Sequence, residues 1–261
     1  MKGMKAIGGF LGVCGLLLAA GCFENRSAPT DAVTATSLEQ LAATNRAAVQ
    51  RLILRGNGRA LKAGDLVGMP VLEMLDLSEN GFTNVPDEVF QQRNLEELYL
   101  ARNALATVPA RLAELEKLDY LNLDGNVLES AEGLGKLPNL MWLRLNENRL
   151  AEIPDSLGGL AKLQRFYARR NKLTKIPEAA RGWLDLEDLV LDGNPIAEVP
   201  DWLTTLPRLK GISLNNTHLT RLPADLAPWR RLDYLALGGC RFPPEEMKRI
   251  REALPDVAIV F

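Results

Sequence analysis

Leucines and polar residues alternate in one pattern that recurs along most of the chain. When the copies are aligned, the pattern LxxLxLxxN repeats at intervals of 22 or 23 residues. One copy starts at Val49, and the later copies start at Leu72, Leu95, Leu118, Leu140, Leu163, Leu186, Leu209 and Leu232. Self-similarity at a fixed period of this length predicts a repeat architecture in which each copy is one structural unit.

The fourth and sixth residues of each copy predict a short strand. Leu75 and Leu77, for example, alternate with polar residues at a period of two, which places both leucines on one face. Nine such strands are expected to stack in parallel. The ninth position is asparagine in the first seven copies, then Thr217 and Cys240. An amide there can satisfy backbone groups of the turn that leaves the strand, so these residues are assigned a structural role.

The return segment of most copies contains an apolar residue followed by proline, as in Val85-Pro86 and Ile153-Pro154. Proline restrains φ and interrupts ladder pairing, so an irregular turn or a short helix, bulkier than a strand, is expected there. Unequal widths bend a stack, and the narrower strands should therefore line its concave wall.

Both ends of such a stack need caps, because an open end exposes the core and the strand edges. Residues 37–48 are expected to form the N-terminal cap, since Ser37-Leu38-Glu39-Gln40 has the spacing of a capping box. Residues 243–261 are expected to form the C-terminal cap, with a helix to about Leu254 and a final strand over 257–261.

These copies resemble 23-residue leucine-rich repeats of the form LxxLxLxxNxLxxIPxxLxxLxx, over residues 49–242. The resemblance implies an α/β fold. It would be a right-handed, curved solenoid with a parallel concave sheet of about nine strands, irregular or short helical convex segments and helical caps. It also implies a ligand-binding scaffold. Two copies depart from the pattern. The copy at Leu118 is one residue short and lacks the proline, and the copy at Leu163 has Phe166 and Ala168 in place of leucines, which can compensate in volume.

Residues 1–22 have the layout of a signal peptide: two lysines, an apolar stretch and small residues before Cys22. The ending Leu18-Ala19-Ala20-Gly21-Cys22 resembles the lipobox of bacterial lipoproteins, although Ala19 stands where that family more often has leucine. The resemblance implies that Cys22 is diacylated and becomes the N-terminus after cleavage. An ordinary cleaved signal or an uncleaved membrane anchor are the alternatives, and each would still export the domain.

Residues 23–36 are rich in Ser, Thr, Ala and Pro and offer little to bury, so a flexible linker between a membrane and a folded domain is expected. In lipoproteins of Gram-negative bacteria, Asp after the cysteine is the usual signal for retention at the inner membrane. Phe23 stands at that position, which favours the outer membrane or periplasm if the host is Gram-negative.

Composition and charge argue against several function classes. With 47% hydrophobic and 25% charged residues and a net charge of −2, the chain is an ordinary globular protein with no implied affinity for nucleic acid. Two of three cysteines lie in the first 22 residues, so Cys240 is expected as a lone thiol in a monomer without disulfides. His218 has no Cys or His neighbour at metal-ligand spacing. No metal, cofactor or enzymatic activity is expected.

The third, fifth, seventh and eighth positions of each copy are expected to point away from the core, free to recognise a ligand. All four tyrosines and Trp142 fall at third or fifth positions, and Tyr, Trp and Arg dominate binding hot spots. The candidate ligand-binding residues are Tyr99, Arg102, Tyr120, Trp142, Arg144, Arg165, Tyr167, Arg169 and Arg170. The alternative is that exposed strand positions favour aromatic residues in any case, with Trp142 and Arg165 forming only a surface cation–π pair.

The other tryptophans are expected elsewhere. Trp183 and Trp229 occupy a position that is leucine in other copies and should lie in the core, whereas Trp202, on the return side, is ambiguous. The leading hypothesis is a cell-envelope module, held at a membrane by its N-terminal lipid, that binds a protein or peptide on its concave face. Glycan binding is an alternative, because aromatic rings also stack on sugars. A structural envelope protein with no specific ligand is another.

Overall fold

The computed structural model describes residues 32–261 apart from positions 44, 59–60 and 63. The predicted signal peptide 1–22, its lipidation site Cys22 and most of the predicted linker 23–36 lie outside the described residues. The chain divides into two units, Met1–Ala32 and Val33–Phe261, and the fold described below is that of the second unit.

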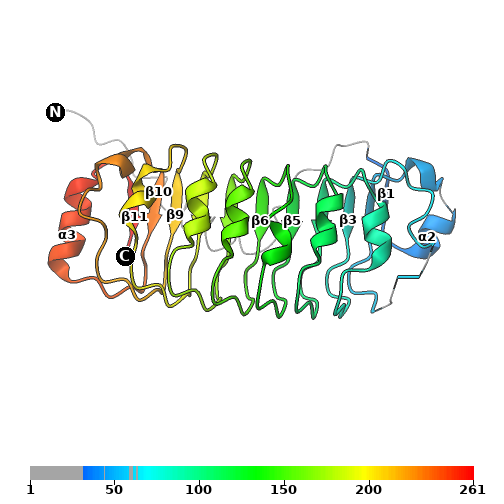
Figure 1. The fold of residues 1–261 in the computed structure, drawn as a ribbon, viewed down its shortest axis with the longest axis horizontal. Helices are drawn as coiled ribbons and strands as arrows, with labels where there is room; N and C mark the ends of the chain where they lie inside the picture. The colour runs from blue at the N-terminus through cyan, green and yellow to red at the C-terminus, as the bar shows by residue number, and fades with distance from the viewer. Residues whose placement is uncertain (1–31, 44, 59–60, 63) are drawn as a thin grey trace, which may run out of the picture. The chain divides into compact units, whose positions relative to one another are not determined.

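Eleven short strands form one open parallel sheet, and their order in the sheet follows the chain (Figure 1). Nine of them, β2 to β10, belong to the nine predicted repeats. Two more flank these: β1 before the first repeat and β11 at the predicted C-terminal strand. The strands are β1 (Thr34–Ala35), β2 (Arg51–Ile53), β3 (Met74–Asp76), β4 (Glu97–Tyr99), β5 (Tyr120–Asn122), β6 (Trp142–Arg144), β7 (Arg165–Tyr167), β8 (Asp188–Val190), β9 (Gly211–Ser213), β10 (Tyr234–Ala236) and β11 (Ala258–Val260).

The pairing register aligns each repeat position with the same position in the next copy. Leu75 of β3 lies beside Leu98 of β4, and Leu98 lies beside Leu121 of β5. These leucines have no exposed surface. The predicted period of two therefore holds: one face of the sheet builds a continuous leucine core, and the backbone ladder joins the copies.

Short 3₁₀ turns form the opposite side of the stack (Figure 1). Proline stands directly before five of these turns, for example Pro86 before η2, where its oxygen accepts a hydrogen bond from the Val89 N–H at 3.1 Å. This agrees with the predicted short helical return segments. The turns are η1 (Arg46–Ala48), η2 (Asp87–Gln91), η3 (Ala110–Glu114), η4 (Glu132–Leu134), η5 (Asp155–Gly159), η6 (Glu178–Gly182), η7 (Asp201–Thr205) and η8 (Ala227–Arg231).

Helices α2 (Leu38–Ala43) and α3 (Pro244–Ala253) close the two ends. At the first, the Ser37 Oγ accepts a hydrogen bond from the Gln40 N–H at 3.0 Å, as in the predicted capping box. The sheet extends beyond α2, because Thr34 and Ala35 pair with β2. The sheet thus begins within the segment 23–36 that was expected to be a linker.

The C-terminal helix α3 is held against the return segment of the eighth copy by hydrogen bonds of Arg249 and Glu246. Arg249 pairs with Glu246 at 2.8 Å and donates to the backbone oxygens of Leu222 and Pro223. Ile250 of the same helix is fully buried in the core. Within the described residues, no helix is long and apolar enough to cross a bilayer.

A ladder of asparagine side chains runs through the interior beside the strands. The Asn148 amide donates to the oxygens of Leu123 and Leu145 at 3.0 and 3.1 Å, and its Oδ1 accepts from the Leu128 N–H at 3.0 Å. The same arrangement recurs from Asn80 to Asn194. The predicted structural role of the ninth position is confirmed, since these bonds satisfy polar backbone groups that the stack buries.

The last two ladder positions use other side chains for the same purpose. The Thr217 Oγ1 donates to the Leu214 oxygen at 2.8 Å, and the Cys240 Sγ lies 3.1 Å from the same oxygen. Cys240 is a free thiol. Its position supports the expectation that it is structural, although it is half-buried rather than fully buried.

In the atypical sixth copy, unusually large and unusually small core residues compensate for one another in volume. The rings of Phe166 and Trp183 lie 4.6 Å apart, and both side chains are fully buried. In the same copy, Ala168 and Ala180 stand where other copies have leucine, so the two large rings take up volume that the two small residues leave. Trp229 is also fully buried, which confirms the core assignment of both tryptophans.

Candidate binding surface

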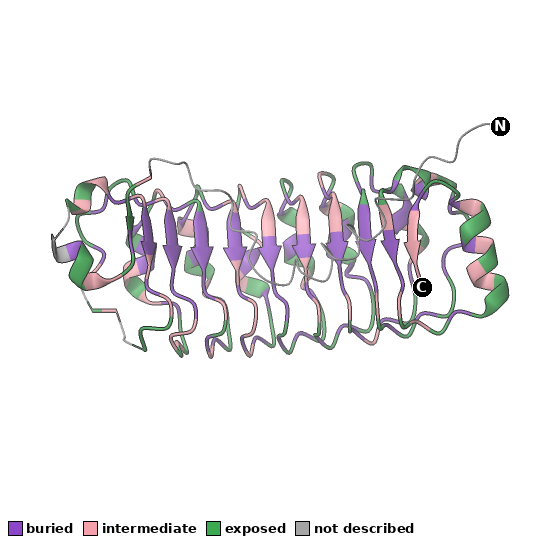
Figure 2. Cartoon of the chain, turned by 180° about the vertical axis from the view of Figure 1, so that it is seen from behind, coloured by how far each residue is buried: buried purple, intermediate pink, exposed green. Residues whose placement is uncertain are grey.

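The face of the sheet opposite the leucine core is here called the sheet face (Figure 2). The third- and fifth-position side chains alternate with the buried leucines along each strand and lie on this face. The register sets third positions side by side, as in Tyr120, Trp142 and Arg165. Fifth positions align in the same way, as in Arg144 and Tyr167. Because adjacent strands are only about 4.8 Å apart, each side chain packs against its counterpart in the next copy.

Aromatic side chains form a continuous stack across β4, β5 and β6. The ring centroids of Tyr99 and Tyr120 are 4.9 Å apart, and those of Tyr120 and Trp142 are 5.7 Å apart. The Arg165 guanidinium lies 4.0 Å above the Trp142 ring and extends the stack to β7. Tyr120, Trp142 and Arg165 form the third-position row that the sequence spacing predicts and the register confirms. Tyr99, from the fifth-position column, joins this row through its ring contact with Tyr120.

The stack is more buried than expected. Tyr120 is 2% exposed and Tyr99 5%, and together with Met74 they form an apolar cluster separate from the main core. The expectation that outward positions are free of packing duties is corrected for these residues. The physical cause is crowding, since large rings on strands so closely spaced cover one another.

Burial also controls ionisation in this row. Burial raises the pKa of Tyr120 to about 12 and raises that of Tyr99 further, so both hydroxyls remain protonated at neutral pH. The Tyr99 hydroxyl donates a hydrogen bond to the Glu97 carboxylate at 2.9 Å. The stack therefore carries no phenolate at neutral pH.

Arginines of the fifth and seventh positions pair with carboxylates from neighbouring copies. Arg144 is only 7% exposed and lies 2.7 Å from Asp124, and its guanidinium is 5.7 Å from the Tyr167 ring. Arg169 pairs with Asp192 at 3.1 Å. These predicted residues are fixed by the fold before any ligand arrives, which limits the conformational entropy that binding would cost.

A second constellation at β7 to β10 was not foreseen from the sequence. Tyr234 lies across Gly211, where an added Cβ would be 2.2 Å from its ring, and its hydroxyl reaches Asp188 at 3.3 Å. Arg165 approaches the same carboxylate at 3.3 Å. Burial raises the Asp188 pKa even though Arg165 opposes the shift. The sequence signal was the lone glycine at a third position, which makes room for a tyrosine from the next strand.

The eighth positions form the edge of the sheet face where the strands end, here called the strand-end edge. All nine have φ between 50° and 74°, the left-handed region that favours glycine. Arg102 and Arg170 lie there, with 64% and 76% of their side chains exposed. Their recorded partners are Glu79 and Glu147, so these two predicted residues belong to the edge and not to the aromatic stack. The edge comprises Gly56, Glu79, Arg102, Gly125, Glu147, Arg170, Gly193, Asn216 and Gly239.

Comparison with known proteins agrees with this geometry. A family model described as leucine rich repeat matches residues 70–128. A leucine-rich-repeat protein from Leptospira interrogans has 28% identity and a TM-score of 0.56, and the match covers 82% of this chain and 72% of that one. The fold is a leucine-rich-repeat solenoid.

Two internalins from Listeria monocytogenes share that solenoid fold. Internalin F gives a TM-score of 0.69 at 21% identity and covers 82% of this chain, which spans 61% of the internalin. Internalin C2 gives 0.60 at 22% identity, covering 78% of this chain and 89% of its own. Curated protein sequences give no match.

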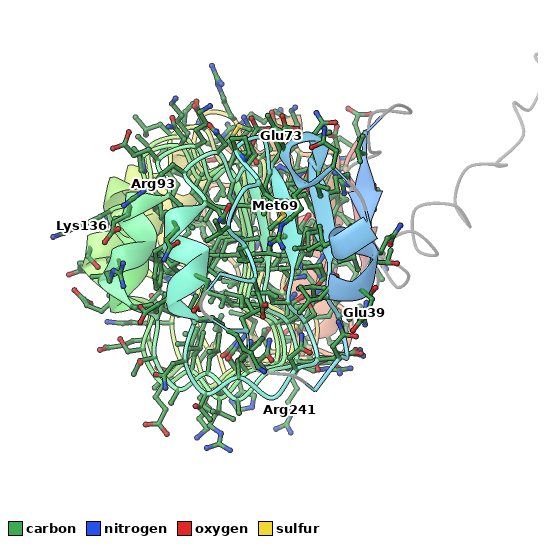
Figure 3. The ribbon with its side chains drawn as sticks, turned by 90° about the vertical axis from the view of Figure 1, so that its right-hand side faces the viewer. Glu39, Met69, Glu73, Arg93, Lys136 and Arg241 are labelled. Atoms are coloured by element: carbon green, nitrogen blue, oxygen red, sulfur yellow. The ribbon has the colours of Figure 1, made fainter. Side chains whose placement is uncertain are left out.

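The edges of the solenoid are charged. Viewed from the α2 end, Glu73 projects at the edge where the strands begin, Arg241 projects at the opposite edge, and Arg93 and Lys136 lie on the side of the 3₁₀ turns (Figure 3).

On the side of the 3₁₀ turns, Trp202 is covered by Arg181 at 4.7 Å, and its Nε1 donates to Glu178 at 3.3 Å. The ambiguous tryptophan thus takes part in a cluster on the side of the 3₁₀ turns.

Residues that could support catalysis or metal binding are dispersed. In the part of the chain that the structure describes, no three His, Cys, Asp or Glu side chains gather in a way that could hold a metal ion. His218 is exposed. Nothing in the described solenoid or in its relatives points to catalysis.

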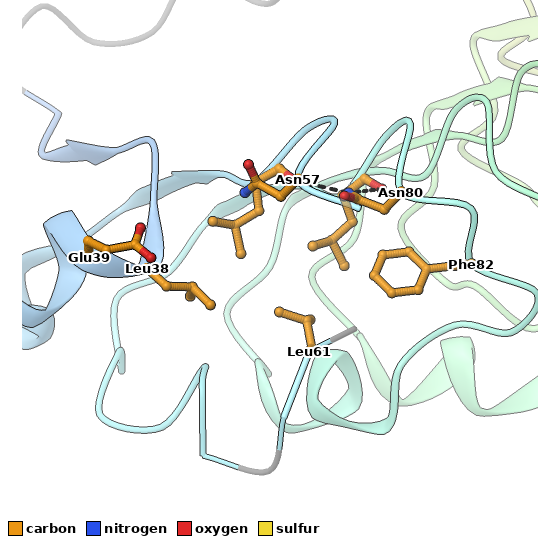
Figure 4. Close-up of a pocket in the computed structure, with 8 residues that line it drawn as sticks. Leu38, Glu39, Asn57, Leu61, Asn80 and Phe82 are labelled. Carbon is orange, nitrogen blue, oxygen red and sulfur yellow. Dashed lines mark hydrogen bonds between the residues drawn. The ribbon is translucent and has the colours of Figure 1, made fainter. Parts of the chain in front are cut away.

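A cavity of about 160 Å³ lies near the N-terminal cap, away from the sheet face (Figure 4). Five of its eight lining residues are apolar, and Asn57 and Asn80 stand at one side. Asn57 is exposed, and within the described residues it makes none of the ladder bonds that Asn80 makes to Leu54 and Leu77. The cavity therefore marks the open start of the asparagine ladder. Its lining is Leu38, Glu39, Leu54, Asn57, Leu61, Leu77, Asn80 and Phe82.

Proposed function

We propose that this chain is an exported lipoprotein, anchored through Cys22, whose sheet face binds a protein or peptide in the cell envelope. The leucine-rich-repeat solenoid is a fold consistent with a protein-binding module. The observation that carries the proposal is the row of Tyr99, Tyr120, Trp142 and Arg165 across four consecutive strands. Large, fixed aromatic and arginine side chains in contact are the usual composition of a binding hot spot.

The geometry of the row favours a peptide over a glycan. Sugar stacking needs an open ring face, but Tyr120 packs between Tyr99 and Trp142, and Arg165 covers the Trp142 ring. A ligand can contact the ring edges, the arginines beside the row and the half-buried Tyr167. Backbone and side-chain groups of a peptide can use such edges through hydrogen bonds and edge-on ring contacts.

The test replaces Trp142 and Tyr167 with alanine in the full-length chain. Crosslinking in intact cells from a photoreactive group beside position 142 identifies the captured partner. We expect the double variant to lose at least about tenfold in affinity for that partner and to melt within a few degrees of the parent chain, because neither side chain belongs to the leucine core.

Trp202→Ala is the matched control, since Trp202 is also a half-buried tryptophan covered by an arginine but lies on the other side. It should leave capture unchanged. Equal capture by the parent chain and the double variant would contradict the site assignment. Retention on purified cell-wall polymer without any protein partner would instead support the glycan alternative.

A further inference from the structure

The sheet face contains a larger repeat of three copies. At the eighth position, the second to fourth copies are matched by the fifth to seventh copies, 68 residues later, and one of the three pairs at the fifth position and one at the seventh also match. Glu79, Arg102 and Gly125 occupy three successive eighth positions, and the next three have the same residue types in the same order. The matched pairs are Glu79 and Glu147, Tyr99 and Tyr167, Arg102 and Arg170, Asp124 and Asp192, and Gly125 and Gly193.

The two sets have the same ion-pair geometry. The Arg102 Nη1 donates to the Glu79 Oε1 at 2.9 Å, and the Arg170 Nη1 donates to the Glu147 Oε1 at 3.0 Å. All four residues have positive φ, between 50° and 62°. Charged side chains at backbone positions that favour glycine, repeated in equivalent places, point to selection for the side chains and not for the turn.

Each arginine also rests on a glycine of the following copy. A Cβ placed on Gly125 would lie 3.1 Å from the Arg102 Cγ, and one on Gly193 would lie 3.3 Å from the Arg170 Cγ. The two glycines therefore make room for the aliphatic part of each arginine and hold its guanidinium over the strand-end edge. Each set is one preformed arginine site.

Near each site, an aspartate side chain links the copy that follows the arginine to the next copy. The Asp124 Oδ1 accepts the Asn146 N–H at 2.8 Å, and the Asp192 Oδ1 accepts the Asn215 N–H at 2.9 Å. These bonds link the seventh positions of adjacent copies outside the strands. Sheet-like bonds continue at the eighth position, where the Arg102 N–H donates to the Asp124 oxygen at 2.7 Å. The strand spacing is therefore maintained along the strand-end edge.

The distance between the two sites follows from that spacing. They lie three copies apart, which is about 14 Å at about 4.8 Å per strand. In an extended peptide, residues i and i+4 point to the same side and lie about 13 to 14 Å apart at about 3.4 Å per residue. One extended peptide along the strand-end edge can therefore place two side chains in the two sites at once.

The charges at the strand-end edge favour acidic side chains in the bound peptide. Each guanidinium has five N–H donors and uses one in its recorded bond with glutamate. Arg55 also pairs with Glu79 at the first site, and the exposed Arg149 and Lys172 lie two residues from Glu147 and Arg170 in the sequence. The neighbouring Asp124 and Asp192 carboxylates are paired with other arginines, Arg144 and Arg169. Hydrogen bonds from Arg55 and Arg102 lower the Glu79 pKa to about 2. The site thus keeps its ion pairs wherever a peptide carboxylate is ionised.

We propose that Arg102 and Arg170 are two equivalent anchor sites for one extended acidic peptide, each taking a carboxylate from residues four apart. The inference rests on the proposed peptide-binding function and specifies its ligand. Double engagement raises affinity through effective concentration, so a peptide of the right spacing gains over one that reaches a single site.

The test selects binders from a displayed library of random peptides on the purified full-length chain. We expect enrichment of Asp or Glu at positions i and i+4. In synthetic peptides from that selection, moving one acidic residue by a single position should lower affinity about tenfold, because its side chain then points away from the edge. Either Arg102→Ala or Arg170→Ala should remove this dependence on spacing.

Arg93→Ala is the matched control, because Arg93 is an exposed arginine paired with a glutamate of the next copy, Glu114, on the side of the 3₁₀ turns. It should change nothing. Acidic peptides without preferred spacing, or a preference that survives both edge variants, would overturn the paired sites. Selected peptides that lack acidic pairs but need Trp142 and Tyr167 would overturn this inference and leave the proposed function standing. Failure to select any peptide would contradict both.

Discussion

A single ladder residue shows how the interior of the solenoid is satisfied. Asn148 is 8% exposed and makes four bonds to backbone groups of its own and the preceding copy. Asn57, at the same position of the first copy, is exposed and makes none of the corresponding bonds within the described residues. The same residue type therefore has two energetic roles, which depend on whether a full repeat precedes it.

This difference predicts that alanine substitutions of Asn148 and Asn57 change the free energy of unfolding by different amounts. Asn148→Ala leaves the buried Leu128 N–H without its partner and removes one of the two amide donors to each of the Leu123 and Leu145 oxygens. We expect it to lower the free energy of unfolding by about 2 to 4 kcal/mol. Asn57→Ala should change it by less than about 0.5 kcal/mol. Urea denaturation measures both. Equal effects of the two substitutions would show that the buried ladder bonds do not stabilise the stack.

At the strand-end edge, several residues adopt a backbone conformation that lowers the stability of the fold. Non-glycine residues with positive φ cost about 1 to 2 kcal/mol each, and Glu79, Arg102, Glu147, Arg170 and Asn216 all adopt it. Exposed ion pairs such as those of Arg102 and Arg170 recover little of this cost, because solvent screens them. These side chains are therefore poorly explained by stability alone, which is consistent with a role in binding.

At the scale of elements, close packing between neighbouring turns explains two glycines of the short fourth copy. Turn η4 has three residues where η3 and η5 have five. A Cβ on Gly133 would lie 2.1 Å from the Val108 oxygen, and one on Gly135 would lie 2.6 Å from the Ser156 oxygen. Turn η4 therefore lies so close to its neighbours that only glycine fits at these two positions.

Gly133→Ala should therefore destabilise the chain by about 1 to 3 kcal/mol, because backbone atoms must move apart to accept the methyl group. Gly159→Ala in η5 is the control, since its Cβ would be 3.3 Å from the nearest atom, the Gly135 oxygen. That variant should be neutral or slightly stabilising. Chemical denaturation of the two variants gives their free energies of unfolding. The difference between them is the effect of close packing, because both variants lose a glycine. A loss for Gly159→Ala as large as that for Gly133→Ala would contradict this explanation.

The elements also explain where the candidate surface lies. Strands of only three residues present two outward side chains each, so no strand alone can form a site. The stack of β4 to β7 joins such pairs into a row because the register is the same at every step. A change of one residue in that register would turn the outward set into the core.

At the scale of the whole molecule, the solenoid is a chain of nearest-neighbour contacts closed by two caps. Its proposed place at a membrane depends on residues 1–22, which precede the described part. A lipid-anchored binding module would act only on partners within reach of the membrane surface. Two acyl chains make such an anchor stable, whereas a single chain gives only marginal binding.

Mass spectrometry of the mature protein tests this placement. The expected N-terminus is Cys22 with a mass increment of a diacylglyceryl group, and Cys22→Ser should remove the increment and release the chain from the membrane fraction. Cys240→Ser is the control, since Cys240 lies in the ladder and should leave fractionation unchanged. An unmodified N-terminus downstream of Cys22 would rule out lipidation.

The sequence alone determined the number of repeats, their strands, the inward leucines, the asparagine ladder, the core tryptophans and the capping box at Ser37. These features depend on local periodicity, because alternation along a strand decides which side chains face inward whatever the rest of the chain does. The residues of the aromatic row were also identified, since their columns follow from the repeat.

Only the tertiary structure decided what those outward residues do to one another. The burial of Tyr99 and Tyr120, the position of Tyr234 over Gly211 and that of Arg102 over Gly125 each join residues from different copies. The backbone conformation of the eighth position likewise became visible only in three dimensions. Spacing places side chains in columns, but strand separation, ring size and turn conformation decide which of them are buried, paired or left to meet a ligand.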